Sequence, residues 1–144
     1  MTSLSCLADD FAAAFARRDV DGVMRCFTVD ASYADLFLGV HRGSASLRAM
    51  FERMFASAGH SWSFEHVVAG DGRVVAEWRF SVGRGSRVVS FGGVSVFDLD
   101  PGSGRCRAYR EYFDRGAALV ALGTPARVLE RVVGRHPTVS VVGG

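Results

Sequence analysis

Apolar residues in the first third of the chain recur every three or four positions, which is the spacing of amphipathic helices. The pattern predicts a helix ending near Arg17-Arg18, a short helix from about Asp19 and a third helix from Gly43-Ser44. The apolar stripe of the third helix consists of Leu47, Met50, Phe51, Met54 and Phe55. The charged residues expected on its solvent side are Arg48, Glu52 and Arg53. Between these helices, the polar segment 30–35 favours a small strand followed by a loop.

After Gly59 the apolar spacing changes to every second residue, which is typical of half-buried strands. The first predicted strand places on one face Trp62, Phe64, His66 and Val68. The next strand places on one face Val74, Ala76, Trp78, Phe80 and Val82. Two further strands are expected over 87–98, with a bulge or bend at Gly92-Gly93, and over 105–113. A final helix is expected over 114–123.

Three helices, a four-stranded antiparallel meander and a last helix predict an α+β domain. A strongly curved sheet would wrap around the helices and leave a cone-shaped apolar cavity. With 144 residues and no linker-like segment, the chain is expected to form one domain. We assign residues 1–123 to this domain and 124–144 to a C-terminal extension of it, in which Thr124-Pro125 begins a further helix.

The amino-acid composition excludes some catalytic groups and disfavours some binding partners. The chain has no lysine, asparagine or glutamine, so all 17 basic residues are arginine and neither a lysine Schiff base nor a side-chain amide can take part in catalysis. A net charge of +2 disfavours a nucleic-acid partner, and no apolar run approaches the ~20 residues of a membrane span. Four histidines without ligand spacing indicate no metal site, and no cofactor is expected. Three isolated cysteines favour a reducing cytoplasm.

Several segments together resemble the opening and closing motifs of the NTF2-like superfamily. These segments are 15–22, Phe27, 30–33, Arg42-Gly43 and 109–114. Over residues 5–123 the chain is most similar to SnoaL-like polyketide cyclases, limonene-epoxide hydrolases and ketosteroid isomerases. The resemblance implies the NTF2-like cone, in which N-terminal helices pack inside a strongly curved antiparallel sheet. It is less specific for the reaction, because this scaffold carries several enzyme activities and non-catalytic binding proteins.

The ketosteroid isomerases supply the first comparison of single residues. Asp35 falls where those enzymes have their general-base aspartate. Their oxyanion-binding tyrosine and protonated aspartate correspond to Phe11 and Ser95, so steroid isomerisation by that constellation is not expected.

The limonene-epoxide hydrolases supply the second comparison. Tyr33 matches a water-binding tyrosine, Glu111 takes the place of a catalytic aspartate, and Tyr109 replaces a tryptophan. The arginine and second aspartate of those enzymes correspond to Trp78 and Phe80, so the charged triad that activates water is lost.

These comparisons make Asp35, Glu111 and Tyr33 the candidate catalytic residues. Asp35 would remove a proton and Glu111 would donate one, with Tyr33 as a hydrogen-bond donor, and the two carboxyl roles could be exchanged. The structural alternatives are a turn-capping role for Asp35 and a salt bridge of Glu111 with Arg79 or Arg107.

A hydrophobic substrate would contact residues expected on the inner face of the cone. The candidates are Trp62, Trp78, Phe80, Phe91, Tyr109, Phe11, His66 and Ser95. For His66 the alternative is a core residue with satisfied hydrogen bonds. The predicted function is a cyclase or isomerase of a hydrophobic natural-product intermediate, acting without a cofactor. An epoxide hydrolase and a non-catalytic binding module remain alternatives, and the resemblance implies a homodimer.

Overall fold

The computed structural model describes residues 4–36, 38–57, 59–121, 123–125, 128 and 140–142. Its helices are α1 (Leu4–Ala16), α2 (Val20–Arg25), α3 (Ser44–Ala56) and α4 (Arg115–Ala121). Its strands are β1 (Phe27–Asp35), β2 (Gly39–Arg42), β3 (His60–Gly70), β4 (Arg73–Arg84), β5 (Arg87–Leu99), β6 (Cys106–Phe113) and β7 (Ser140–Val142). The predicted helix from Thr124-Pro125 through Val133 falls mostly outside the described residues.

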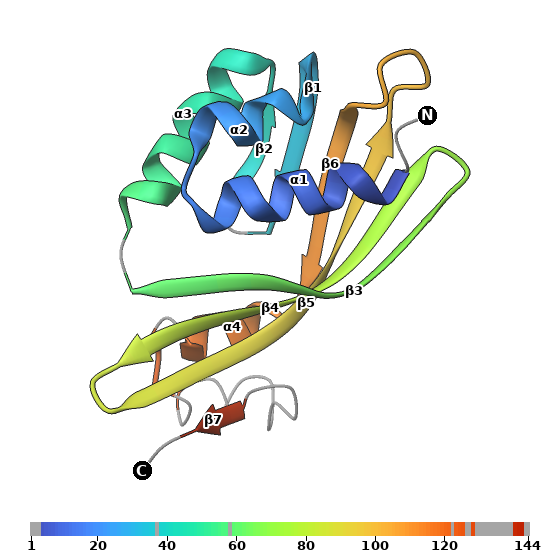
Figure 1. The fold of residues 1–144 in the computed structure, drawn as a ribbon. Coiled ribbons are helices and arrows are strands. Elements are labelled where there is room, and N and C mark those ends of the chain that lie inside the picture. Colours follow the sequence, from blue (N-terminus) through green and yellow to red (C-terminus); the bar gives the residue numbers. More distant parts are fainter. Residues whose placement is uncertain are drawn as a thin grey trace.

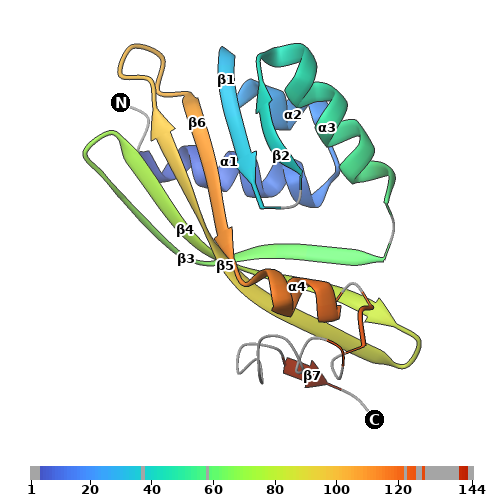
Figure 2. The ribbon, with the colours of Figure 1, turned by 180° about the vertical axis from the view of Figure 1, so that it is seen from behind.

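All the strands belong to one curved, unclosed sheet with the order β2-β1-β6-β5-β4-β3. Strands β3 to β6 form the predicted antiparallel meander. Strand β1 pairs antiparallel with β2 but parallel with β6, and β7 pairs with β5 at Val88–Ser90, beyond the stretch that β6 occupies. Helix α1 crosses the upper half of the sheet, and α4 lies against the lower half (Figures 1 and 2). The predicted α+β fold is therefore confirmed.

The connections between helices are fixed by a few specific contacts. Asp19 caps α2, because its side chain accepts a hydrogen bond of 2.8 Å from the backbone N–H of Gly22. Arg18 has a φ of 55°, which ends α1 by a left-handed residue. The Arg18 guanidinium then donates to the carbonyl oxygens of Phe55 and Ser57, at 3.1 and 2.8 Å. The end of α1 is thereby attached to the end of α3.

The sheet has three irregularities among the described residues, and none lies at Gly92-Gly93. These glycines pair in register with Arg79 and Trp78, so the predicted bulge is absent there. Glycine is needed instead for space, because a Cβ on Gly93 would lie 2.3 Å from Cζ2 of the Trp78 ring. One irregularity is a shift between Phe27 and Ser32 in the pairing of β1 with β6. The pairing of β3 with β4 shifts between Phe64 and His66, and that of β5 with β6 shifts between Asp98 and Leu99.

Two clusters of buried side chains fill different parts of the inner face. The first surrounds the fully buried Phe11 of α1, whose ring contacts Phe97 and Tyr109 of the sheet. The second packs Trp78 and Phe91 against the alanines of α4. Among the described residues, no helix combines the length and apolar character that crossing a membrane requires.

Candidate active site

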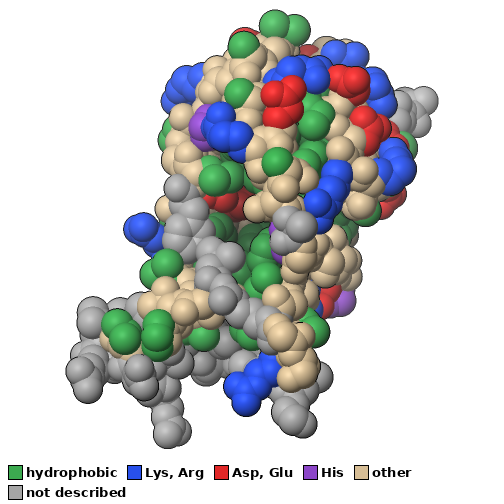
Figure 3. Space-filling view, turned by 90° about the vertical axis from the view of Figure 1, so that its left-hand side faces the viewer, with side chains coloured by type: hydrophobic (Ala, Val, Ile, Leu, Met, Phe, Trp, Pro, Cys, Tyr) green, Lys and Arg blue, Asp and Glu red, His purple; other side chains and the backbone are tan. Residues whose placement is uncertain are grey.

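A cavity of about 380 Å³ lies on the inner face of the sheet, between the ends of α1 and α3 and the strands. Figure 3 views this side of the molecule, where hydrophobic side chains surround a hollow with acidic atoms inside it. The residues that line the cavity are Phe15, Tyr33, Asp35, Leu38, Met50, Arg53, Met54, Ser57, His60, Trp62, Trp78, Phe80, Phe91, Glu111 and Phe113. The volume is within the range of small-molecule sites.

Strand pairing brings the two candidate carboxyl groups into this cavity. Tyr33 of β1 lies beside Tyr109 of β6, and the side chains two positions later on each strand, Asp35 and Glu111, point to the same inner face. Ser95 of β5 lies directly opposite Glu111. Asp35 and Glu111, far apart in sequence, thus meet because β1 and β6 are neighbours.

A chain of hydroxyl groups surrounds Glu111. The phenol of Tyr33 donates to Oε1 of Glu111 at 3.3 Å, and the phenol of Tyr109 donates to the same oxygen. Behind it, Oγ of Ser95 lies 2.6 Å from Oη of Tyr109. The rings of Tyr33 and Tyr109 stack with their centroids 4.3 Å apart. Both rings are almost fully buried, so this network holds the Glu111 carboxyl in one position.

The surroundings of Glu111 favour its protonated form. Burial raises its pKa from an ordinary value of 4.5 to about 8, and a negative charge on Asp35 contributes to the increase. A hydrogen bond from protonated Glu111 to Asp35 acts in the same direction, whereas the two tyrosine hydroxyls act in the opposite one. Burial also raises the pKa values of Tyr33 and Tyr109 well above their usual range. At neutral pH all three groups therefore hold a proton.

The structural alternatives to catalysis are a turn-capping role for Asp35 and a salt bridge for Glu111. Among the described residues, the structure shows the first but not the second. Asp35 does cap a turn, since its Oδ1 accepts a hydrogen bond from the backbone N–H of Leu38, yet it also lines the cavity. Glu111 does not pair with Arg79, because Arg79 forms a 2.6 Å ion pair with Glu65 on the outer face. Within the described parts of the chain, Glu111 forms no salt bridge with any arginine, including Arg107.

Four predicted contact residues do line the cavity wall, namely Trp62, Trp78, Phe80 and Phe91. Trp78 lies at their centre, with its ring centroid 5.9 Å from that of Phe91, and it occupies the space that Gly93 leaves free. Its indole Nε1 is buried and has no hydrogen-bond partner within the described residues. The wall is therefore aromatic and presents few polar groups of its own.

Four other predicted contact residues do not reach the cavity. Phe11 is fully buried beneath α1, because neighbouring aromatic rings enclose it completely. His66 is exposed on the outer face, because the bulge at Glu65 inserts one residue and reverses the alternation after Phe64. Ser95 and Tyr109 are buried behind Glu111, and they contact the cavity only through it.

The sequence pattern also missed several lining residues. Helix α3 presents Met50, Arg53 and Met54 to the cavity, at the spacing of one helix face, and Ser57 follows at its C-cap. Arg53 is exposed, as predicted, and it also lines the cavity, which the pattern did not indicate. The apolar pattern predicts that Met50 and Met54 lie on the buried face of the helix, but it does not predict that this face borders a cavity.

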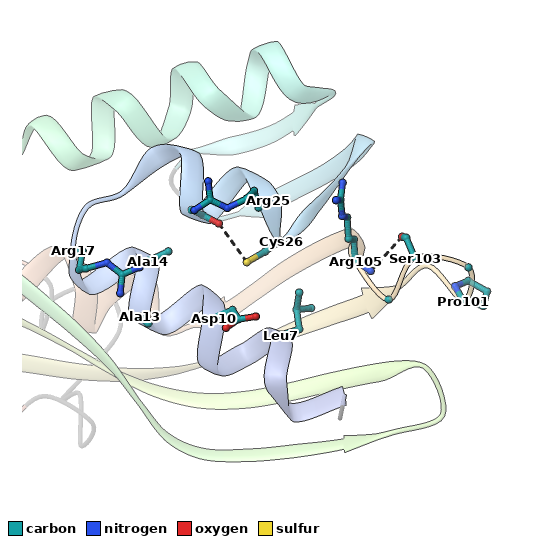
Figure 4. A pocket seen from close by; sticks show the side chains of 13 residues that line it. Leu7, Asp10, Ala13, Ala14, Arg17, Arg25, Cys26, Pro101, Ser103 and Arg105 are labelled. Carbon is teal, nitrogen blue, oxygen red and sulfur yellow. Dashed lines mark hydrogen bonds between the residues drawn. The ribbon is translucent and has the colours of Figure 1, made fainter. Parts of the chain in front are cut away.

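A second hollow, of about 840 Å³, runs along α1 from Leu7 to Arg17 (Figure 4). It is bounded by α1, α2 and the turn from Pro101 to Arg105. Its thiol, Cys26, donates to the carbonyl oxygen of Gly22, and burial together with the charge of Asp10 raises its pKa to about 11. Such a thiol is a poor nucleophile at neutral pH. Although larger, this hollow lacks a paired acid and base, so the aromatic cavity is the candidate active site.

The described residues contain no cluster of three or more histidine, cysteine, aspartate or glutamate side chains able to hold a metal ion. The cavity thus offers acid–base groups and apolar surface. Those groups can transfer protons to and from a ligand and hold it in a fixed shape.

Comparison with known families agrees with the fold. The SnoaL-like domain family matches residues 8–109. The chain belongs to the SnoaL-like family. No curated protein is significantly similar in sequence.

Solved structures of SnoaL-like and related proteins have the same fold at low sequence identity. The M. tuberculosis LEH-like epoxide hydrolase is 24% identical, with a TM-score of 0.69 over 83% of this chain and 84% of its own. The epoxide hydrolase/cyclase-like enzyme SalBIII, which acts in pyran ring formation in the polyether salinomycin, is 21% identical, with a TM-score of 0.66 over 78% and 91%. A putative polyketide cyclase from Xanthomonas campestris pv. campestris is 18% identical, with a TM-score of 0.69 over 83% and 96%.

Proposed function

We propose that this SnoaL-like protein is a cofactor-independent acid–base cyclase or isomerase of a hydrophobic natural-product intermediate. The observation that carries the proposal is a carboxyl group held protonated, Glu111, beside a second carboxyl group, Asp35, in an aromatic cavity. Two neighbouring carboxyl groups can act as acid and base when their different environments keep one protonated and leave the other ionised. The structural neighbours include an LEH-like epoxide hydrolase and the epoxide hydrolase/cyclase-like enzyme SalBIII, and this supports the same class of chemistry.

The reaction that fits best is ring closure by epoxide opening. Asp35 takes the proton of a substrate hydroxyl, whose oxygen attacks an epoxide carbon and forms the new C–O bond. The old C–O bond of the epoxide breaks, and Glu111 donates its proton to the leaving oxygen. Asp35 then returns the gained proton to Glu111 through the hydrogen bond between them. Each group of this kind typically contributes about 10²–10⁴-fold to a rate.

Ring closure suits this cavity better than hydrolysis. The wall positions where limonene-epoxide hydrolases have charged water-activating groups are occupied here by Trp78 and Phe80. A substrate that supplies its own hydroxyl needs no activated water, and an aromatic wall can hold it in the folded shape that brings hydroxyl and epoxide together.

The test uses a hydrophobic 4,5-epoxy alcohol in ¹⁸O-labelled water, with products resolved by mass spectrometry. A cyclase yields a cyclic ether without solvent oxygen, whereas a hydrolase yields a labelled diol. We expect Glu111→Gln and Asp35→Asn each to lower kcat/KM by at least 10²-fold. The matched control is His66→Ala, which removes a titratable side chain from the outer face and should leave kcat/KM unchanged.

The pH profile adds a second readout. Because only protonated Glu111 can donate, kcat/KM should fall as pH rises through about 8. A profile flat from pH 6 to 9, or variants as active as the wild type, would reject the acid–base roles of Glu111 and Asp35, and no turnover at all would favour a non-catalytic binding module.

We also propose a cytoplasmic homodimer that pairs through the outer face of the sheet. Val68 of β3 lies opposite Val75 of β4 on that face, and both are exposed, as is Tyr112 of β6. Exposed apolar residues grouped in this way are typical of interaction surfaces. Light scattering at micromolar concentration should give the mass of a dimer, and Val68→Asp should shift it to that of a monomer.

A further inference from the structure

Arg53 is the cationic group of the candidate active site. It lies on the cavity face of α3 between Met50 and Met54, and it is exposed, so it stands where the cavity opens to solvent. The same opening is marked by Leu38 and Ser57, which are exposed lining residues as well. Glu111 lies deeper, where it contacts buried tyrosines, and Asp35 connects it to the opening, because Asp35 also accepts the backbone N–H of Leu38.

Arg53 forms no ion pair with another described residue. In the described part of the chain no carboxylate lies within ion-pair distance of it, although Arg48 on the same helix pairs with Asp21 at 2.7 Å. At the end of α3, Arg18 donates to the carbonyl oxygen of Phe55 and the backbone N–H of Ser57 donates to that of Met54. Arg53 is therefore not needed to cap the helix.

His60, the other basic lining residue near the opening, adds no charge to that of Arg53. His60 stacks on Phe80 with centroids 5.4 Å apart. Burial and the nearby Arg18 lower the pKa of His60, so it is uncharged at neutral pH. The opening is thus cationic, the wall is aromatic and the far end is acidic.

This change of side-chain character along the cavity favours one orientation of a bound ligand. We propose that Arg53 binds a carboxylate at the outer end of the substrate, so that the apolar body enters first and the reacting centre reaches Asp35 and Glu111. The inference deepens the proposed function by naming the substrate class, a hydrophobic carboxylic acid. A guanidinium pairs well with a carboxylate through two parallel N–H···O bonds. Inside the cavity the same carboxylate would meet the negative charge of Asp35, which fixes the direction of entry.

Binding can be measured without any turnover, which separates this inference from the proposed function. The two tryptophans of the chain, Trp62 and Trp78, both line the cavity, so their fluorescence reports on occupancy directly. The probes are octanoate and its uncharged analogue octanamide, titrated at pH 7. We expect wild type to bind octanoate about tenfold more tightly than octanamide, within the range of a charge-assisted hydrogen bond.

Substitutions then locate the source of the preference. Arg53→Met should remove the tenfold preference while leaving the affinity for octanamide unchanged, and Arg53→Lys should retain part of it. The matched control is Arg48→Met, which removes the same charge from the solvent face of the same helix and should keep the preference. Circular dichroism confirms that each variant is folded.

Three results would overturn the inference. They are equal affinities of wild type for octanoate and octanamide, an unchanged preference in Arg53→Met, and no fluorescence response to either probe. A failure of the 4,5-epoxy alcohol test with an intact octanoate preference would reject the proposed reaction and leave the binding role of Arg53 standing.

Discussion

The two halves of the inner sheet face have similar residues and opposite uses. Beneath α1, aromatic rings around Phe11 fill the space completely, and Phe11 has no exposed surface. Toward the end of α3, equally aromatic strand positions such as Trp78 and Phe80 border a cavity of about 380 Å³. The difference comes from the helix above the strands rather than from the strands themselves. Over the first region, α1 inserts the ring of Phe11 and fills the space against the strands. Over the second region, Met50 and Met54 of α3 border the space without filling it, so a cavity remains.

The largest predicted effect contrasts one aromatic residue from each half. Phe11→Ala should lower the free energy of unfolding by about 3–5 kcal/mol, because it leaves an enclosed void. Phe80→Ala should lower it by only about 1 kcal/mol, because its ring already borders a hollow. Urea unfolding of both variants measures the contrast. Similar losses for the two would mean that the cavity half is as tightly packed as the other.

A substitution at Gly93 should displace Trp78, which forms part of the cavity wall. A methyl group at this position would overlap the Trp78 ring, so Gly93→Ala should move the indole toward the cavity and cost about 1–3 kcal/mol. Gly83→Ala, on the neighbouring strand with open space around it, is the control and should change stability by less than about 0.5 kcal/mol. Trp fluorescence should shift only in the first variant. An unchanged spectrum would contradict this role of Gly93.

The raised pKa of Glu111 gives the cavity half a pH dependence. Between pH 4.5 and about 8, an unfolded chain has lost this proton while the folded protein keeps it, so rising pH destabilises the fold. Glu111→Gln cannot ionise and should escape this loss. Its stability relative to wild type should therefore grow from pH 5 to 8 by about 1–3 kcal/mol in urea unfolding. A difference independent of pH would show that Glu111 titrates normally.

The smallest predicted effect concerns Ser95, behind the carboxyl pair. Ser95→Ala removes the 2.6 Å hydrogen bond to Tyr109 and should cost about 1 kcal/mol. Tyr109 then becomes a weaker donor to Glu111, so the pKa in the kcat/KM profile should rise slightly. Ser81→Ala loses a comparable 2.8 Å bond to Ser90 away from the carboxyl pair and should leave the profile in place. Identical profiles for the two variants would assign Ser95 a purely structural role.

Much of the fold and part of the site could be predicted from local periodicity. Alternation along β6 placed Glu111 with Phe113 on the inner face, because this strand has no irregularity between them. The same rule failed for His66, since one inserted residue at Glu65 reverses the face and leaves no signal in the apolar pattern. The helical stripe could not separate core from cavity either, because both require apolar side chains at Met50 and Met54.

Long-range pairing was also beyond the reach of local patterns. The parallel contact of β1 with β6 joins Tyr33 to Tyr109, and only this contact makes Asp35 a neighbour of Glu111. The family resemblance supplied what periodicity could not, because it carried the positions of both carboxyl groups. It gave no indication of Arg53, which the α3 pattern had assigned to solvent.

The indole of Trp78 has a consequence for how such a protein can diversify. It rests on Gly93 and α4, so its position is determined by residues that do not line the cavity. Replacement of a small residue beneath it would reshape the chamber while both carboxyl groups stay in place. Evolution, or a directed-evolution experiment, can therefore change which molecule is accepted without rebuilding the proton-transfer groups.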